Sequence, residues 1–229
     1  RADQVFRYDI LQDCIKIDEN KFIHIRPVIN LQEDGVNLLD LINKYRELKT
    51  SRHPLIEIYN VNALSDDQHP RSRYLLLIQA IEGLYGYEHK EEYQQRCEQY
   101  TEKRNTLLEK VKPAVSKEDF RFVKKNFPRR PFSGLRDALN TTFQGLPKSV
   151  QDQIDGSEII TQVRNESGSK RISSADALTN VRNKLSHGSS LSDPNDLEEI
   201  CSLLDKIVRA EIFRVLELPD AARQRMIES

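Results

Sequence analysis

The stretch Ser173–Gly188 reads Ser-Ser-Ala-Asp-Ala-Leu-Thr-Asn-Val-Arg-Asn-Lys-Leu-Ser-His-Gly, and it predicts a capped amphipathic helix. Ser173 is a favourable N-cap. Asp176 stands three residues later at the capping-box position, with Asp in place of the usual Glu or Gln. Gly188 is a natural stop directly after His187. We therefore expect a helix that begins after Ser173 and ends at His187.

The two faces of this helix differ in character, because a step of about 100° per residue separates apolar from polar side chains. The apolar stripe contains Leu178, Val181 and Leu185, and the opposite arc contains Arg182, Asn183, Ser186 and His187. A solvated polar face is the simplest interpretation of that arc. The alternative is a site in which a guanidinium binds phosphate and an imidazole, at the negative end of the helix dipole, moves a proton.

The spacing between Arg182 and His187 is a weak signal by itself. With 20 Arg and 5 His in the chain, an Arg four to six residues before a His is expected roughly once by chance. Arg46 and His53 form a second match, but Pro54 biases His53 away from helical geometry. The 182–187 pair therefore has the better setting, since one helix carries both groups.

Composition limits the kinds of protein this chain can be. The 229 residues carry a net charge of −1, so no overall basic field gathers nucleic acid, and any RNA contact must be local. Cys14, Cys97 and Cys201 are odd in number and lack metal-ligand spacing, which indicates reduced thiols in a cytoplasmic protein. We expect Cys201 to fill space in the core.

Targeting signals are not visible in the sequence. No apolar run approaches the length of a membrane span, and no signal peptide is recognisable. The chain begins without Met in a segment that already looks structured, which suggests the C-terminal part of a longer protein.

The N-terminal part is ambiguous. Two apolar runs, 14–17 and 22–25, flank a polar segment and favour a β-hairpin, although 5–15 also carries a helical pattern. We predict that 1–60 is an attachment or a linker from a preceding domain.

Residues 61–229 are predicted to form an all-α bundle. We expect helical structure at 35–48, a mostly irregular connection at 52–70, and a long helical region from Pro70 to Val111. The second half of that region is strongly charged, which indicates an exposed, projecting helix with a bend near Gly86. Further helices are expected at 116–126, 133–145, 147–154, 159–164 and 173–187, followed by a long closing helix that starts at Asp193-Pro194.

Glu82 lies within the most apolar part of the chain, where a charge needs a partner. In one interpretation its carboxylate reaches the Arg182 face and holds the guanidinium or the imidazole. In the other, Glu82 lies at the edge of the apolar stripe in water.

The segment 120–136 is basic and is interleaved with aromatic residues. Cations neutralise phosphates and aromatic rings stack bases, so this segment is the best candidate RNA-binding track. The cations that we assign to it are Lys124, Lys125, Arg129 and Arg130, and the interleaved rings are Phe122, Phe127 and Phe132. Alternatively, the rings belong to the core and the cations to a solvated loop.

Other chemistries lack a sequence signal. The chain has no Gly-rich phosphate loop, no supported Ser-His-Asp arrangement and no clustered metal ligands. We therefore expect neither a metal nor a cofactor.

The segment Arg182-Asn183-Lys184-Leu185-Ser186-His187 resembles the signature of the HEPN superfamily, an Arg and a polar residue followed by a His. A helix of the type 75–82 stands about 100 residues upstream, and a closing helix ends at 212–218. Together these features resemble the ApeA-type HEPN domains of bacterial antiphage proteins over 70–225. The preceding segment is similar to the linker that joins those domains to an N-terminal domain.

The resemblance implies a metal-independent endoribonuclease that cleaves RNA by attack of the ribose 2′-hydroxyl during abortive infection. Arg182, His187, Asn183 and Glu82 would then form the catalytic set. It also implies a homodimer, and an N-terminal sensor domain outside this chain would gate the activity. The alternative is a non-catalytic HEPN module that binds a partner protein or a nucleotide.

Overall fold

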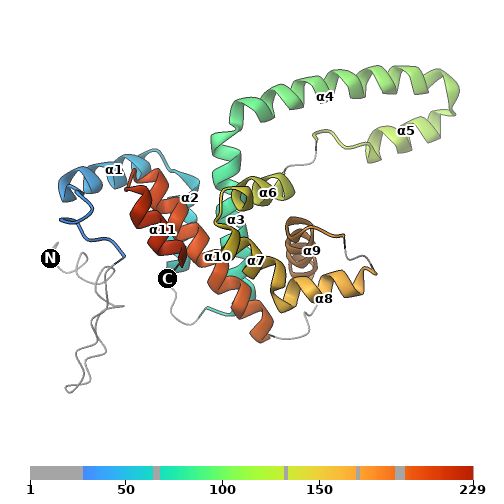
Figure 1. The fold of residues 1–229 in the computed structure, drawn as a ribbon. Helices are drawn as coiled ribbons and strands as arrows, with labels where there is room; N and C mark the ends of the chain where they lie inside the picture. Colours follow the sequence, from blue (N-terminus) through green and yellow to red (C-terminus); the bar gives the residue numbers. More distant parts are fainter. Residues whose placement is uncertain (1–27, 64–67, 132–133, 169–170, 189–193, 229) are drawn as a thin grey trace.

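The computed structural model of the chain describes residues 28–63, 68–131, 134–168, 171–188 and 194–228 (Figure 1). Within these ranges the fold is all-α, with eleven α-helices and no strand, which confirms the predicted class. The hairpin predicted within residues 14–25 lies outside the described residues.

The helices follow one another with short connections. In chain order they are α1 (Leu38–Thr50), α2 (Pro54–Ala63), α3 (Pro70–Glu88), α4 (Lys90–Val111), α5 (Lys117–Asn126), α6 (Leu135–Gln144), α7 (Lys148–Gly156), α8 (Glu158–Glu166), α9 (Ser174–Ser186), α10 (Pro194–Val215) and α11 (Asp220–Glu228). Most of these bounds lie within two residues of the expected ones, and the start of α3 at Pro70 is confirmed.

The expectation of a mostly irregular connection over 52–70 is wrong, because α2 occupies Pro54–Ala63. Leu55 and Ile56 are buried, and α2 packs along α3. Tertiary burial of a short apolar run therefore stabilises a helix that the Pro-flanked sequence did not reveal.

The core is built around α3 and α10, which lie against each other in the middle of the bundle (Figure 1). Their apolar stripes are almost completely removed from water. The largest fully buried side chains on them are Tyr74, Leu77, Ile78, Ile81, Ile200 and Leu204. Cys201 is buried among them, as expected, and burial raises the pKa of its thiol to about 12.

A helical hairpin projects from this bundle (Figure 1). The chain leaves α3 at His89, which is both the C-cap of α3 and the N-cap of α4, three residues beyond the bend expected near Gly86. Beyond this point Leu108 is the one buried residue of α4. A short 3-10 turn at Lys112–Ala114 then reverses the chain into α5. The prediction of an exposed, projecting helix is confirmed, and we call 90–130 the arm.

The segment before α1 is attached to the C-terminal helix. Arg225 donates to the Val28 carbonyl at 3.0 Å and pairs with the Asp34 carboxylate at 2.6 Å.

Helix α2 runs across residue 60, where we placed the start of the helical domain, and that boundary stays a prediction. In the part of the chain that the structure describes, no helix combines the length and apolarity needed to cross a membrane.

Candidate active site on helix α9

Helix α9 begins as its sequence predicts. The Ser173 hydroxyl accepts the backbone N–H of Asp176 at 3.1 Å and donates to the Asp176 carboxylate at 2.7 Å. The same carboxylate pairs with Arg136 of α6 at 2.9 Å. The start of α9 is thus capped and also tied to a neighbouring helix.

The apolar stripe of α9 faces the core. Leu178, Val181 and Leu185 are all buried, and the helix packs on α3, α6 and α8. The buried Tyr74 hydroxyl donates to the Leu178 carbonyl at 2.8 Å. Because this face is fixed in the bundle, the opposite arc with Arg182 must point away from the core.

Arg182 lies between two polar neighbours. Its Nη2 stands 4.0 Å from the Glu82 Oε2 on α3, and its Nη1 donates to the Asn183 Oδ1 at 3.2 Å. The side chain of Arg182 is nevertheless 42% exposed and that of Glu82 29% exposed. Glu82 thus combines the two interpretations of its sequence, because it lies near the Arg182 guanidinium and is also partly in water.

His187 is the C-cap of α9 and is exposed. Its backbone N–H donates to the Asn183 carbonyl at 3.1 Å, and this bond fixes the position of the His187 backbone at the end of α9. Gly188 follows with φ of +82°, a conformation that glycine adopts without a steric penalty and that ends the helix. Asn183 thus accepts from both candidate residues, from the Arg182 guanidinium with its side chain and from the His187 backbone N–H with its carbonyl.

Two long-range contacts stabilise this end of α9 and were not predicted. Arg71, in the first turn of α3, donates to the Leu185 carbonyl, where a cation also meets the negative end of the α9 dipole. Lys184 pairs with Glu166 of α8, and this hydrogen bond holds the pKa of the Glu166 carboxyl below its usual value. The sequence offered no signal for either partner.

A family model of Apea-like HEPN domains matches residues 75–222. This chain belongs to the Apea-like HEPN family. The matched range runs from α3 into α11 and contains all four candidate residues, Glu82, Arg182, Asn183 and His187. No curated protein and no solved structure shows a significant match to the chain. HEPN domains are typically ribonucleases, so membership supports a nuclease-related or antiphage role.

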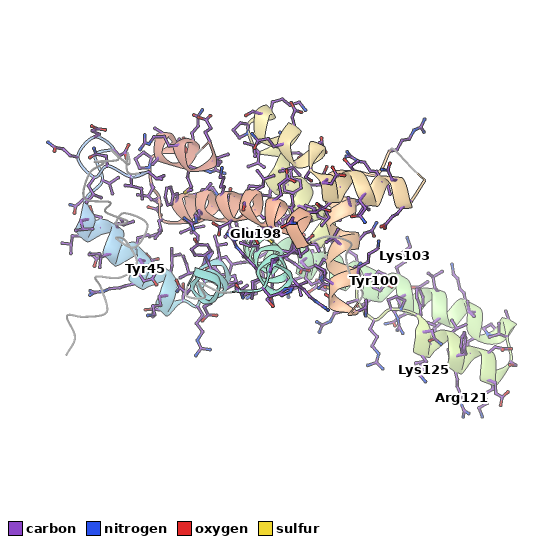
Figure 2. The ribbon with its side chains drawn as sticks, turned by 90° about the horizontal axis from the view of Figure 1, so that it is seen from below. Tyr45, Tyr100, Lys103, Arg121, Lys125 and Glu198 are labelled. Carbon is purple, nitrogen blue, oxygen red and sulfur yellow. The ribbon has the colours of Figure 1, made fainter. Side chains whose placement is uncertain are left out.

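The candidate RNA-binding residues of this HEPN chain lie on the arm rather than on α9. Lys124 and Lys125 are in the last turn of α5, Arg129 and Arg130 follow it, and all four are exposed. Figure 2 shows Lys125 in the projecting hairpin. Phe132 lies outside the described residues.

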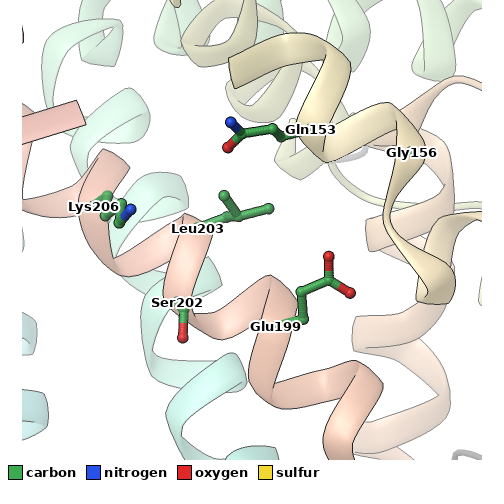
Figure 3. A pocket seen from close by; sticks show the side chains of 6 residues that line it. All are labelled: Gln153, Gly156, Glu199, Ser202, Leu203 and Lys206. Atoms are coloured by element: carbon green, nitrogen blue, oxygen red, sulfur yellow. The ribbon is translucent and has the colours of Figure 1, made fainter. Parts of the chain in front are cut away.

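A hollow of about 570 Å³ lies elsewhere on the HEPN bundle, between α7 and α10 (Figure 3). Its lining residues are Gln153, Gly156, Glu199, Ser202, Leu203 and Lys206. None of them belongs to the predicted site. Over the described ranges, no group of three or more His, Cys, Asp or Glu side chains is arranged to hold a metal ion.

Proposed function

We propose that this Apea-like HEPN chain is a metal-independent endoribonuclease that acts in antiphage defence. The observation that carries the proposal is the setting of Arg182. Its guanidinium donates to the Asn183 Oδ1 at 3.2 Å and lies 4.0 Å from the Glu82 carboxylate, yet it remains partly exposed on the helix that ends at the exposed His187. A cation for the phosphate and an imidazole for proton transfer are what phosphate cleavage without a metal requires, and α9 carries one of each.

In the proposed reaction the ribose 2′-oxygen attacks the scissile phosphorus and the bond to the 5′-oxygen breaks. His187 takes the proton from the 2′-hydroxyl as general base, or gives a proton to the departing 5′-oxygen as general acid. The products carry a 2′,3′-cyclic phosphate and a 5′-hydroxyl.

The other three residues would act on the scissile phosphate or on the arginine that binds it. Arg182 holds the scissile phosphate by charge-assisted hydrogen bonds and stabilises the negative charge that grows during attack. Asn183 orients a phosphate oxygen or the imidazole. Glu82 is a positioning residue, because it acts through Arg182.

We further propose that the active form is a homodimer. Arg182 and His187 are separated by about 140° around the axis of α9, so one copy cannot easily surround a phosphate. A second copy related by a two-fold axis would supply its own Arg182 or His187 across the cleft.

A non-catalytic HEPN module is the competing function. One observation favours it: Arg182 is already paired with Glu82 and Asn183, as in an ion pair that stabilises the packing of α3 on α9. In this case Arg182 and His187 would be structural or recognition residues.

The two functions are separated by end-group analysis of RNA incubated with the chain in EDTA. Cyclic phosphate and 5′-hydroxyl ends, absent with His187→Ala, are the expected result. Loss of cleavage in EDTA, or products with 5′-phosphates, would contradict the mechanism. A folded chain that cleaves no RNA would favour the binding module.

A further inference from the structure

The arm is strongly basic, although the net charge of the whole chain is close to zero. Residues 103–130 contain ten Lys or Arg and three Asp or Glu, a net charge of +7. The whole arm, 90–130, contains 12 Lys or Arg and 7 Asp or Glu, a net charge of +5, and the rest of the chain contains 23 Lys or Arg and 29 Asp or Glu, a net charge of −6. The near-neutral total therefore results from a basic hairpin joined to an acidic bundle.

Nearly all of the cations in 103–130 are exposed to solvent. They lie on the hairpin that projects from the bundle (Figure 1). Arg104 is the half-buried exception, and it donates to the carbonyls of Lys124 and Phe127. The exposed cations are Lys103, Lys110, Lys112, Lys117, Arg121, Lys124, Lys125, Arg129 and Arg130. The positive potential of these side chains favours a partner with repeated negative charges.

The aromatic residues of α5 divide into two kinds. Phe120 and Phe127 are half-buried, and the Phe127 ring meets the Tyr100 ring of α4 edge-on at 6.4 Å. Phe122 instead is 68% exposed. Phe127 therefore packs against α4, whereas the exposed Phe122 ring lacks the stabilisation that burial would bring.

Phe122 has cations beside it on the same exposed face. At about 100° per residue, Lys125 lies about 60° from Phe122 around α5, and Arg121 about 100° in the same direction. Figure 2 shows the side chains of Arg121 and Lys125 on one side of the arm. Residues three apart on a helix are neighbours, so the Lys125 ammonium can reach a group that lies on the Phe122 ring.

We propose that the arm binds single-stranded RNA, with Phe122 stacking on a base and with Arg121 and Lys125 binding the adjacent phosphates. This deepens the proposed ribonuclease function and rests on it for the choice of RNA as the polyanion. An exposed ring among cations is the arrangement by which proteins bind unpaired strands, since every base offers a face for stacking. A membrane surface fits less well, because an interfacial helix needs a broad apolar face and α5 exposes a single ring.

The test is fluorescence anisotropy with a labelled uridine-rich single strand and with the same strand annealed into a duplex. The 229-residue chain carries His187→Ala in every variant, so that binding is measured without cleavage. Phe122→Ala should weaken single-strand affinity by about five- to a hundredfold, and Phe122→Tyr should retain it. Duplex affinity should not change with Phe122→Ala, because paired bases are not available for stacking.

Two controls address other roles of the ring. Leu107→Ala removes another exposed apolar side chain of the arm and should leave RNA affinity unchanged. Phe122→Leu should weaken binding nearly as much as Phe122→Ala. If Phe122→Leu instead binds RNA like the parent chain, apolar contact is sufficient at this position and the inference that the ring stacks on a base is wrong.

Absence of RNA binding, or equal affinity of Phe122→Ala and its parent, would also overturn the inference. The proposed ribonuclease would survive either result if the chain with His187 restored still cleaves RNA in EDTA. Conversely, stacking-dependent binding without any cleavage would support the arm and remove the catalytic proposal.

Discussion

Glu82 on α3 and Arg182 on α9 face each other, with 4.0 Å between the carboxylate Oε2 and the guanidinium Nη2. Both side chains are partly exposed, so solvent screens the pair and its contribution to stability is small. We expect the pair to matter for activity, because the Glu82 charge favours orientations of the Arg182 guanidinium that face α3.

We expect Glu82→Gln to lower the rate of RNA cleavage by roughly tenfold, since Arg182 loses the charge that orients it. The free energy of unfolding should change by less than about 1 kcal/mol. Glu166→Gln is the matched control, because it removes the partner of Lys184 on the same helix. Equal losses of activity in both variants would mean that the placement of α9, and not of Arg182, is what matters.

Expression of the chain in bacteria tests the role of His187. The parent chain should slow growth and His187→Ala should relieve that effect, because removal of the imidazole leaves the fold intact at an exposed position. Ser186→Ala, at the exposed neighbouring position, should remain toxic. Equal growth of all strains would favour the binding module.

The proposed homodimer predicts twice the monomer mass in light scattering at micromolar concentration. Two arginines that face each other would repel, so Glu82 or a bound anion should lie between the two copies. Addition of phosphate should therefore strengthen the assembly. A strict monomer that cleaves RNA at full rate would show that one α9 face is sufficient.

Much of the fold could be predicted from the sequence, because long apolar stripes and strong caps report helices locally. The Ser173 cap and the Gly188 stop gave the bounds of α9 almost to the residue. Helices α2 and α11 were missed, since each is short and depends on distant partners. Arg223 of α11 pairs with the buried Glu211 of α10 at 2.5 Å, which no local pattern reveals.

The catalytic roles of the candidate residues stay predictions, and only their positions can be compared with the structure. A carboxylate in an apolar helix needs either a cation or water, and contact with the Arg182 face was one of the two interpretations of Glu82. The Arg71 contact with the Leu185 carbonyl was not accessible, because it joins residues 114 positions apart. The difference in net charge between the arm and the bundle can be counted from the sequence. The structure adds that the basic residues lie on a hairpin that projects from the bundle.

Acidification should destabilise the bundle through His53. Burial lowers the pKa of its imidazole, and Arg214 adds to this effect while Glu88 opposes it. The folded state therefore prefers the neutral ring. Stability is complete above the unfolded pKa of about 6.5 and is lost as the pH falls toward the lower folded value. The melting temperature should drop over this range, and less so in His53→Gln. Identical pH profiles of the two proteins would exclude His53 as the cause.

The cations at the end of α5 are expected to act through the phosphate backbone. Reversal of Lys124 and Lys125 to Glu should weaken binding of all RNA sequences alike, and it should flatten the salt dependence by roughly one unit of slope per lost contact. Folding should be unaffected, because both side chains are exposed. His187→Ala should behave in the opposite way, with binding retained and cleavage lost. Anisotropy titrations at several salt concentrations measure both quantities. If affinity and salt slope are unchanged by the reversal, these cations are only solvated, and the RNA path should be sought first around Lys170 and Arg171 in the segment before α9.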